Sequence, residues 1–357
     1  MIGTTGTMIG DVVTPTLNTT PESYELHQAF SQMVEAGCEY AVMEVSSQGI
    51  KMHRTDGLYF DYGIFTNISP DHIGPGEHAD FEEYLYYKTR LLNMCRIGLV
   101  NKDDEHAEQI IKAADCELYT YSEKGKEADF SASDIRYVSQ PDFVGTEFHI
   151  SGKYDMEVRL GIPGLFNVVN ALAAVSVCSF LDLDKEKISH ALEHIRVNGR
   201  MEIVYTSERC TVLVDYAHNA VSMESLLSTL RDYKPKRLVC VFGCGGNRSK
   251  DRRYSMGEIG GKLADLSIIT ADNSRYEKVE DIIADIRGSI EKTGGSFIEI
   301  PDRREAIRYS ILQAQPGDMV AVIGKGHEDY QEINGVRHHF LDREVIEETV
   351  KELGEKA

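Results

Sequence analysis

Three patterns are missing from this 357-residue sequence, and each absence excludes a class of protein. No apolar run approaches the roughly 20 residues that a membrane-spanning helix requires. The N-terminus has no basic stretch followed by an apolar one, so no secretory signal is predicted. No Gly-x-x-x-x-Gly-Lys-[Ser/Thr] motif occurs, so the sequence offers no Walker-type loop for the phosphates of a nucleotide.

Basic residues are also scarce. The chain has 38 Lys and Arg against 58 Asp and Glu, a net charge of −20, which argues against nucleic acid or an anionic membrane as the main partner. The seven cysteines show no disulfide-framework spacing and suit a reducing cytosol. Cys240 and Cys244 are the only close pair, and without a second pair they favour buried small residues beside a strand end over a zinc site. The composition predicts a cytoplasmic α/β protein.

The C-terminal half has the clearer pattern. Strand-like apolar runs alternate with helical patterns of about 10–15 residues, which predicts βαβ units and a parallel sheet. The strand-like runs are Thr211–Val214, Leu238–Phe242, Leu266–Thr270, Phe297–Ile300 and Met319–Ile323, and the helical patterns are Ser222–Asp232, Arg253–Ala264, Val279–Glu291 and Arg303–Ala314. We place a domain boundary near Asn198-Gly199-Arg200, giving domains 1–198 and 199–357.

The N-terminal domain is predicted as a second α/β unit. Tyr40–Val45 and Tyr62–Ile68 are strand-like, Pro21–Ala36 is helical with Thr20 as its N-cap, and Leu165–Leu181 is a long apolar helix. Short alternating segments from about 117 to 160 predict a small antiparallel insertion. Met1-Ile2-Gly3-Thr4 is typical of a strand end and turn, so we expect this domain to be incomplete at its N-terminus.

Gly324-Lys325-Gly326-His327-Glu328 follows the buried run Met319–Ile323. Ligands of open α/β sheets bind at such strand ends, and the glycines permit close approach of a backbone to a ligand. Lys325, His327 and Glu328 add charge of both signs. The alternative is an ordinary polar turn.

Other strand ends of this half also carry polar residues. Asp215 could accept a hydrogen bond from a ribose hydroxyl group. The alternative is a turn whose polar residues only serve to cap a helix, with Asn219 as the cap. Gly243–Arg248 is a glycine-rich turn that lacks the order of a dinucleotide-binding fingerprint. Arg248 and Arg275 would place two guanidinium groups at one sheet edge to bind a substrate carboxylate, unless both are surface arginines paired with acids.

In the N-terminal half, Glu44 ends an apolar run and is well placed to hold Mg²⁺, if it is not an exposed turn residue. Asp71-His72 follows the next strand-like run and would lie on the same edge, although a lone histidine is more often structural. Lys88 by itself is typical of a solvated surface lysine. Arg200 lies between the domains, where its guanidinium could reach a phosphate.

Ten strings, in order along nearly the whole chain, resemble the Mur ligase family, the ATP-dependent amide-forming enzymes of peptidoglycan synthesis. They are Asn18-Thr19-Thr20, Met43–Ser47, Phe65-Thr66-Asn67, Asp71-His72, Phe166–Ala171, Gly199–Glu202, Val214–His218, Phe242–Gly246, Asp272–Arg275 and Gly324–Glu328. The similarity is greatest to members that add the third residue to UDP-N-acetylmuramoyl-L-alanyl-D-glutamate.

This resemblance implies an ATPase-like central domain followed by a Rossmann-like C-terminal domain. It also implies a reaction in which ATP phosphorylates the D-glutamyl carboxylate and an amine then attacks the acyl phosphate. The implied cofactors are ATP and Mg²⁺, and the implied partners are UDP-MurNAc-L-Ala-D-Glu and a diamino acid. We expect no nucleic-acid partner, no membrane insertion and a monomer.

The resemblance also assigns residues. Glu44 and His72 would bind Mg²⁺, together with Lys88 if it is carbamylated, and Lys88 and His218 would be catalytic. The remaining positions fall into three groups: Thr19, Thr20, Ser46 and Arg54 for the muramoyl dipeptide; Asn170, Arg200 and Asp215 for ATP; and Arg248, Asp272, Asn273, Ser274, Arg275, Gly324 and Glu328 for the incoming amino acid.

Three departures from the family pattern matter. The family's phosphate loop and uridine-binding domain are missing, so we expect this chain by itself to lack ligase activity. Met52 replaces a substrate-binding glutamine, and Ser274 replaces the proline of the usual Asp-Asn-Pro-Arg string. Because Arg275 is retained, meso-diaminopimelate, with its distal carboxylate, is favoured over L-lysine. The competing hypotheses are a lysine-adding ligase, a non-catalytic substrate-binding protein and a folylpolyglutamate-type ligase.

Overall fold

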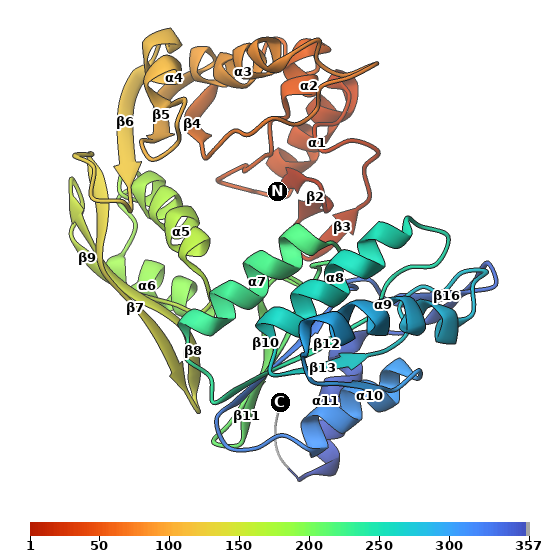
Figure 1. Cartoon of the computed structure of the whole chain (residues 1–357). Helices are drawn as coiled ribbons and strands as arrows, with labels where there is room; N and C mark the ends of the chain where they lie inside the picture. Colours follow the sequence, from red (N-terminus) through yellow and green to blue (C-terminus); the bar gives the residue numbers. More distant parts are fainter. Residues whose placement is uncertain (355–357) are drawn as a thin grey trace. The chain divides into compact units, whose positions relative to one another are not determined.

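The computed structural model describes residues 1–354, which form two compact units (Figure 1). The first unit contains Met1–Ser133, Ile150–Asp155 and Leu172–Leu183, and the second contains the rest of the described chain. The chain passes between the units several times before residue 184, so the domain boundary near 198 stays a prediction. Among residues 1–354, no helix combines the length and the apolarity needed to cross a membrane.

The first unit is built around short strands and helices. Its elements are β1 Ile2–Gly3, β2 Gly6–Ile9, β3 Val12–Thr14, α1 Ser23–Glu35, α2 Ser47–Lys51, β4 Phe60–Phe65, α3 Phe81–Thr89, the 3₁₀ helix η1 Arg90–Asn93, β5 Cys95–Asn101, α4 Ala107–Ala113 and β6 Glu117–Ser122. Strands β4, β5 and β6 pair in parallel, and β1 to β3 form a separate antiparallel sheet. Three elements contribute to both units: β7 Phe130–Gln140, β8 Phe143–Gly152 and α5 Leu165–Cys178.

Helix α1 begins later than predicted. Its N-cap is Glu22, which forms a capping box with Glu25, and not Thr20. The Thr20 hydroxyl is engaged elsewhere, because it donates to the carbonyl of Glu44 at 3.0 Å and accepts from the amide of Ser46 at 2.9 Å. The prediction of Thr20 as the cap was therefore wrong.

Two further predictions for this unit need correction. Tyr40–Val45 is no regular strand: Met43 forms only an isolated bridge to Ile2, and Val42 is 68% exposed, so the run lacks the burial that the pattern implied. Glu117–Ser122 is not part of an antiparallel insertion. Helix α4 carries the chain from β5 across to β6, and this crossover makes β6 parallel to β5. Strand β6 also pairs in parallel with the start of β7.

The second unit contains a doubly wound sheet with strand order β10-β11-β15-β12-β13-β14. The edge strand β10 is antiparallel to β11, and every other pairing is parallel. The unit's elements are β9 Met156–Leu160, α6 Lys185–His194, β10 Glu202–Thr206, β11 Cys210–Asp215, α7 Ala220–Asp232, β12 Arg237–Phe242, α8 Lys250–Leu263, β13 Leu266–Ile269, α9 Val279–Thr293, β14 Phe297–Glu299, α10 Arg303–Leu312, β15 Asp318–Ile323, β16 Tyr330–Ile333, β17 Val336–His339 and α11 Asp342–Glu352.

Helices cover both faces of this sheet (Figure 1). Leu226 of α7, Met256 of α8 and Ile283 of α9 pack on one face, whereas Ile307 of α10 and Val345 of α11 pack on the other. All five predicted strands and four predicted helices of this half are confirmed. Strands such as β11, β12 and β15, which are buried on both faces, appear in a sequence as continuous apolar runs.

Candidate functional site

Three parallel strands, β11, β13 and β15, bring their carboxyl ends to one edge of the sheet of the second unit. Gly324, after β15, donates its amide to the carbonyl of Asp215 at 3.1 Å. Its φ of 111° is available to glycine, and a Cβ placed there would lie 3.0 Å from Oδ2 of Asp272. The structure therefore places Asp215, Asp272 and Gly324 at neighbouring strand ends.

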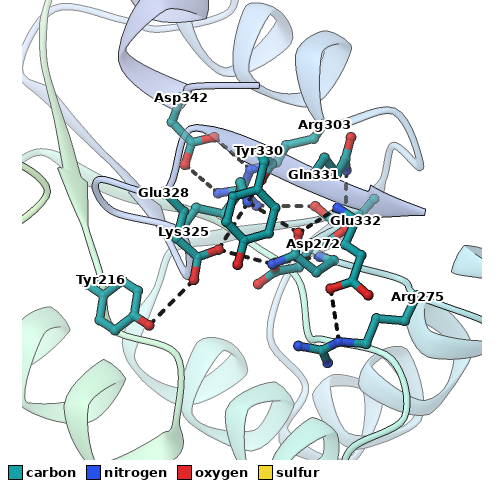
Figure 2. A network of polar contacts seen from close by, with 12 residues as sticks. Tyr216, Asp272, Arg275, Arg303, Lys325, Glu328, Tyr330, Gln331, Glu332 and Asp342 are labelled. Carbon is teal, nitrogen blue, oxygen red and sulfur yellow. Dashed lines mark hydrogen bonds and ion pairs between the residues drawn. The ribbon is translucent and has the colours of Figure 1, made fainter. Parts of the chain in front are cut away.

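A polar network joins Asn273, which follows β13, to the residues that follow β15. Figure 2 shows Lys325, Glu328 and Glu332 of this network. Asn273 Nδ2 donates to Glu328 Oε2 at 3.0 Å, and the Tyr216 hydroxyl donates to Glu328 Oε1 at 3.5 Å. Lys325 donates to the same Oε2 of Glu328 at 3.3 Å. Glu328 is thus held in position by partners from three segments.

Arg275 lies at the side of this network. Its Nη1 donates to the carbonyl of Gly246 at 2.7 Å, and its Nε lies 3.5 Å from Oε2 of Glu332 on β16. A Cβ built on Gly245 would lie 3.1 Å from Nη1 of Arg275 and 3.8 Å from Cγ of the exposed Arg248. The two predicted arginines therefore flank one glycine-rich turn, and Arg275 also has the acidic partner that the alternative interpretation required.

Ser274 is 3% exposed and holds this turn through its backbone. A Cβ on Gly246 would come within 1.9 Å of the Ser274 carbonyl oxygen, so only glycine fits there. The Gly246 amide donates to the Asn273 carbonyl at 2.8 Å. The glycine-rich turn after β12 thus packs on the Asp272–Arg275 segment.

A buried ion pair supports the two strand ends from behind. Arg303 and Asp342 are fully buried and lie 2.7 Å apart. Arg303 Nη1 donates to the carbonyl of Ala271 and Nη2 to that of Ile323, at 3.2 and 3.0 Å. Ala271 and Ile323 immediately precede Asp272 and Gly324 in the chain. The ion pair therefore fixes the backbone just before these two site residues.

The residues predicted to bind ATP are only partly brought together. The carboxylate of Asp215 accepts the amides of Met201 and Ala217, both at 2.7 Å, and Arg200 lies over the ring of Tyr216 at 5.1 Å. Burial raises the pKa of Asp215, and the two amides oppose that shift. Asn170 is exposed on α5 and donates to Asn167, and nothing in the described chain links it to Asp215.

His218, predicted to be catalytic, follows β11 two residues after Tyr216. Its Nδ1 lies 3.0 Å from the carbonyl of Tyr216, and its ring packs 4.8 Å from the Tyr216 ring. Asn219 next to it caps α7 through the amide of Ser222, as the alternative interpretation held. The neighbourhood of Asp215 thus contains both a polar strand end and a helix cap.

In the first unit, the residues predicted to hold the sugar peptide surround one loop. The hydroxyl of Thr4 lies 3.3 Å from that of Thr19 and donates to Glu44 Oε2 at 2.7 Å. Ser46 caps α2, and Arg54 donates to the carbonyl of Thr20 at 3.3 Å. The structure therefore brings Thr19, Thr20, Ser46 and Arg54 close to Glu44.

The predicted metal ligands Glu44 and His72 have different hydrogen-bonding partners. Glu44 is exposed beside β1 instead of ending a strand next to β4, which corrects the expectation that it and Asp71-His72 share a sheet edge. His72 Nδ1 lies 3.3 Å from Glu77. No group of three His, Cys, Asp or Glu side chains in residues 1–354 could hold a metal. This donor set still suits Mg²⁺, which is commonly held by one or two carboxylates together with substrate phosphates.

Lys88 lies on α3 and is half-buried, with Nζ 5.4 Å from the centre of the Tyr84 ring. Burial lowers its pKa, and Asp71 opposes that shift. It is therefore not the fully solvated lysine that the local sequence indicated.

Comparison with known proteins identifies the family. The Mur ligase middle domain matches residues 1–178, and the Mur ligase glutamate ligase domain matches residues 199–326. The chain is 40% identical over 358 residues to UDP-N-acetylmuramoyl-L-alanyl-D-glutamate–2,6-diaminopimelate ligase from Caldanaerobacter subterraneus, covering 99% of this chain and 72% of that relative. The chain belongs to the Mur ligase family.

Other Mur ligase relatives agree. A 2,6-diaminopimelate ligase from Clostridium acetobutylicum is 41% identical over 331 residues, covering 92% of this chain and 67% of its own length. A solved structure of a ligase of the same name superposes with a TM-score of 0.77 at 33% identity, over 99% of this chain and 72% of that one. The folylpolyglutamate synthase of Thermotoga maritima, with a TM-score of 0.59 at 19% identity over 85% of this chain and 68% of its own, shares the fold alone. The predicted α/β class with a Rossmann-like C-terminal part is confirmed.

Sequence reasoning missed several participants of this Mur ligase site. Tyr216, Tyr330 and Glu332 join the network through the hairpin β16–β17 and the turn after β11, and Lys325 is fully buried within it. The sequence signals were the position of Tyr216 inside the Val214–His218 string and that of Lys325 inside the Gly324–Glu328 string, whereas Tyr330 and Glu332 lie outside every string. Cys240 and Cys244 are buried free thiols, and burial raises the pKa of both, to about 12 for Cys244.

Proposed function

We propose that the residues of this chain serve the ligase reaction that joins meso-diaminopimelate to the D-glutamyl residue of UDP-MurNAc-L-Ala-D-Glu, with ATP as co-substrate; that the chain by itself lacks this activity stays a prediction. The observation that carries the proposal is the 40% identity over 99% of the chain to a relative named for this reaction. The site supports it, because Asp272, Asn273, Arg275 and Glu328 converge at one sheet edge. Because the reaction consumes ATP, we place it in the cytoplasm.

The chemistry explains why ATP is needed. A carboxylate is a poor electrophile until one of its oxygens becomes a phosphate leaving group, after which an amine can attack and release phosphate. The protein must then bring the amine to the acyl group and keep water away. Residues that hold the diamino acid in a fixed orientation supply that positioning.

The incoming amino acid requires partners of both signs. Glu328 offers an ionised carboxylate for an ammonium group, and Arg275 offers a guanidinium for a carboxylate. The contacts of Arg275 with Gly246 and Glu332 engage its Nη1 and Nε, so Nη2 remains available for a ligand. A distal carboxylate at Arg275 distinguishes meso-diaminopimelate from L-lysine, which has none.

The first unit would serve the muramoyl dipeptide and the metal. Thr19, Ser46 and Arg54 would contact the sugar peptide, while Glu44 and His72 would bind Mg²⁺, which neutralises phosphoryl charge when bound. A lowered pKa leaves more of Lys88 as the neutral amine, the form that reacts with CO₂ to give a carbamate. Incubation with ¹³C-bicarbonate should therefore give a carbamate NMR signal that the Lys88→Arg variant lacks, and its persistence in that variant would refute the assignment.

Calorimetric titration of meso-diaminopimelate and of L-lysine into the chain tests the proposed amino-acid specificity. Tighter binding of meso-diaminopimelate supports the proposal, and tighter binding of L-lysine would indicate a lysine-adding ligase. Substitution of Arg275 by Met should remove the preference. The matched control is Arg287→Met, which changes an arginine on α9 whose partners are Glu291 and Glu299.

A further inference from the structure

Lys325 lies at the centre of the network in Figure 2 and is 0% exposed. Its Nζ donates to Glu328 Oε2 at 3.3 Å, to Asn273 Oδ1 at 3.4 Å and to the carbonyl of Tyr330. The same atom lies 5.2 Å from the centre of the Tyr330 ring. A lysine is rarely buried to this extent unless it is paired.

The three acceptors match the three N–H bonds of an ammonium group. No N–H of Lys325 is left to contact a phosphate, and its Nζ has no lone pair or access with which to attack a substrate. Direct catalytic or phosphate-binding roles therefore do not fit. The contacts of Lys325 all lead to protein atoms, and two of these belong to residues assigned to the amino-acid site.

Lys325 constrains both of these residues. Asn273 Oδ1 also accepts the amide of Glu332 at 2.9 Å, so the contact ties Asn273 to hairpin β16–β17. An ionised carboxylate accepts about four hydrogen bonds, and Glu328 receives three, from Lys325, Asn273 and Tyr216. Glu328 therefore keeps capacity for a ligand ammonium while its rotamer is fixed.

Lys325 also contributes to the charge of this sheet edge. Its Nζ lies 3.3 Å from Oε2 of Glu328, the carboxylate assigned to the ligand's ammonium group. Removing Lys325 makes the edge more negative by one unit, which favours a ligand of net charge +1 such as L-lysine over a diamino diacid of zero net charge.

We propose that Lys325 is a positioning residue of the amino-acid site, which fixes Glu328 and Asn273 and balances the site's charge in favour of a diamino diacid. This inference rests on the proposed function in assigning Glu328 and Asn273 to the incoming amino acid. Lys325 acts through these residues and does not itself touch the ligand.

The test is calorimetric titration of meso-diaminopimelate and L-lysine into the wild-type chain and the Lys325→Met variant. Loss of one buried charged hydrogen-bond donor should weaken meso-diaminopimelate binding by roughly 10- to 100-fold. The preference for meso-diaminopimelate over L-lysine should also fall by about fivefold, since one unit of charge near the ligand is removed. Lys325→Arg should keep the preference while losing affinity, because it retains the charge but not the geometry.

The matched control is Arg337→Met, which removes a long cation that lies 4.2 Å from the same Tyr330 ring but on the exposed strand β17. It should change both affinities by less than about twofold. In a double-mutant cycle, Lys325→Met in a Glu328→Gln background should have a much smaller effect than in the wild type. Additive effects, or a wild-type preference in Lys325→Met, would overturn the proposal.

A ligand-free measurement separates this inference from the proposed function. In hydrogen-exchange mass spectrometry, β16 of the Lys325→Met variant should exchange faster than that of the wild type, since the Asn273 side chain that accepts the Glu332 amide loses a partner. If wild-type protein binds neither amino acid, the proposed function fails, whereas the exchange result still decides whether Lys325 positions Asn273. Unchanged exchange in β16 would overturn the positioning role.

Discussion

Substitution of Asp342 by Asn should destabilise the second unit by about 3 kcal/mol. Asp342 and Arg303 are fully buried, and the carboxylate accepts two guanidinium N–H bonds at 2.7 Å. Removing one partner of a buried ion pair typically costs about 3–5 kcal/mol, because the other charge stays buried without compensation. The amide oxygen of Asn can keep one of the two bonds, which places the expected loss at the lower end of that range.

The change is measured as the free energy of unfolding in urea, followed by far-UV circular dichroism because the chain has no tryptophan. The matched control is Glu352→Gln, which makes the same acid-to-amide change in an exposed pair with Arg308 that also joins α10 to α11. We expect no measurable effect from the control. Equal effects of the two substitutions would refute the argument.

Two further predictions concern the turn beside the site and a buried histidine. Gly246→Ala should weaken diaminopimelate binding at least tenfold, because its Cβ would lie 1.9 Å from the Ser274 carbonyl oxygen and displace the Asp272–Arg275 segment. The control Gly288→Ala, within α9 with open space around it, should instead add about 0.5–1 kcal/mol of stability, and equal affinities in both variants would contradict the account. Burial, aided by Lys51, lowers the pKa of His78 below its ordinary value of 6.5, so the unfolded chain takes up a proton at a pH where the folded chain does not. As the pH falls below about 6.5, the wild type should lose stability relative to His78→Gln, and a difference that does not vary with pH would rule this out.

The sheet of the second unit could be predicted from the sequence because its parallel strands are buried on both faces. Leu238–Phe242 and Met319–Ile323 are unbroken apolar runs, and each strand lies within one residue of its predicted bounds. The same pattern failed at Tyr40–Val45, where the apolar residues are exposed. Hairpin β16–β17 escaped prediction because every residue of Val336–His339 is exposed, so this segment has no alternation of burial.

The amino-acid site was only partly accessible to sequence reasoning. Polar residues after strands β13 and β15 indicated one sheet edge, since parallel strands end on the same side. Two acceptors of Lys325, Glu328 and the Tyr330 carbonyl, lie near it in the chain, but the third, Asn273, comes from a separate segment, and no local pattern encodes that contact. For the same reason, no local pattern could show that Glu44 does not share an edge with His72.

The central claim is that the sheet edge formed by Asp272–Arg275 and Gly324–Glu328 binds a diamino diacid. Calorimetric titration of meso-diaminopimelate into the chain, with L-lysine as the comparison, tests it most directly. The account predicts saturable binding of meso-diaminopimelate that is tighter than that of L-lysine and is weakened about tenfold or more in Glu328→Gln. Equal or weaker binding of meso-diaminopimelate, or full binding by Glu328→Gln, would contradict it.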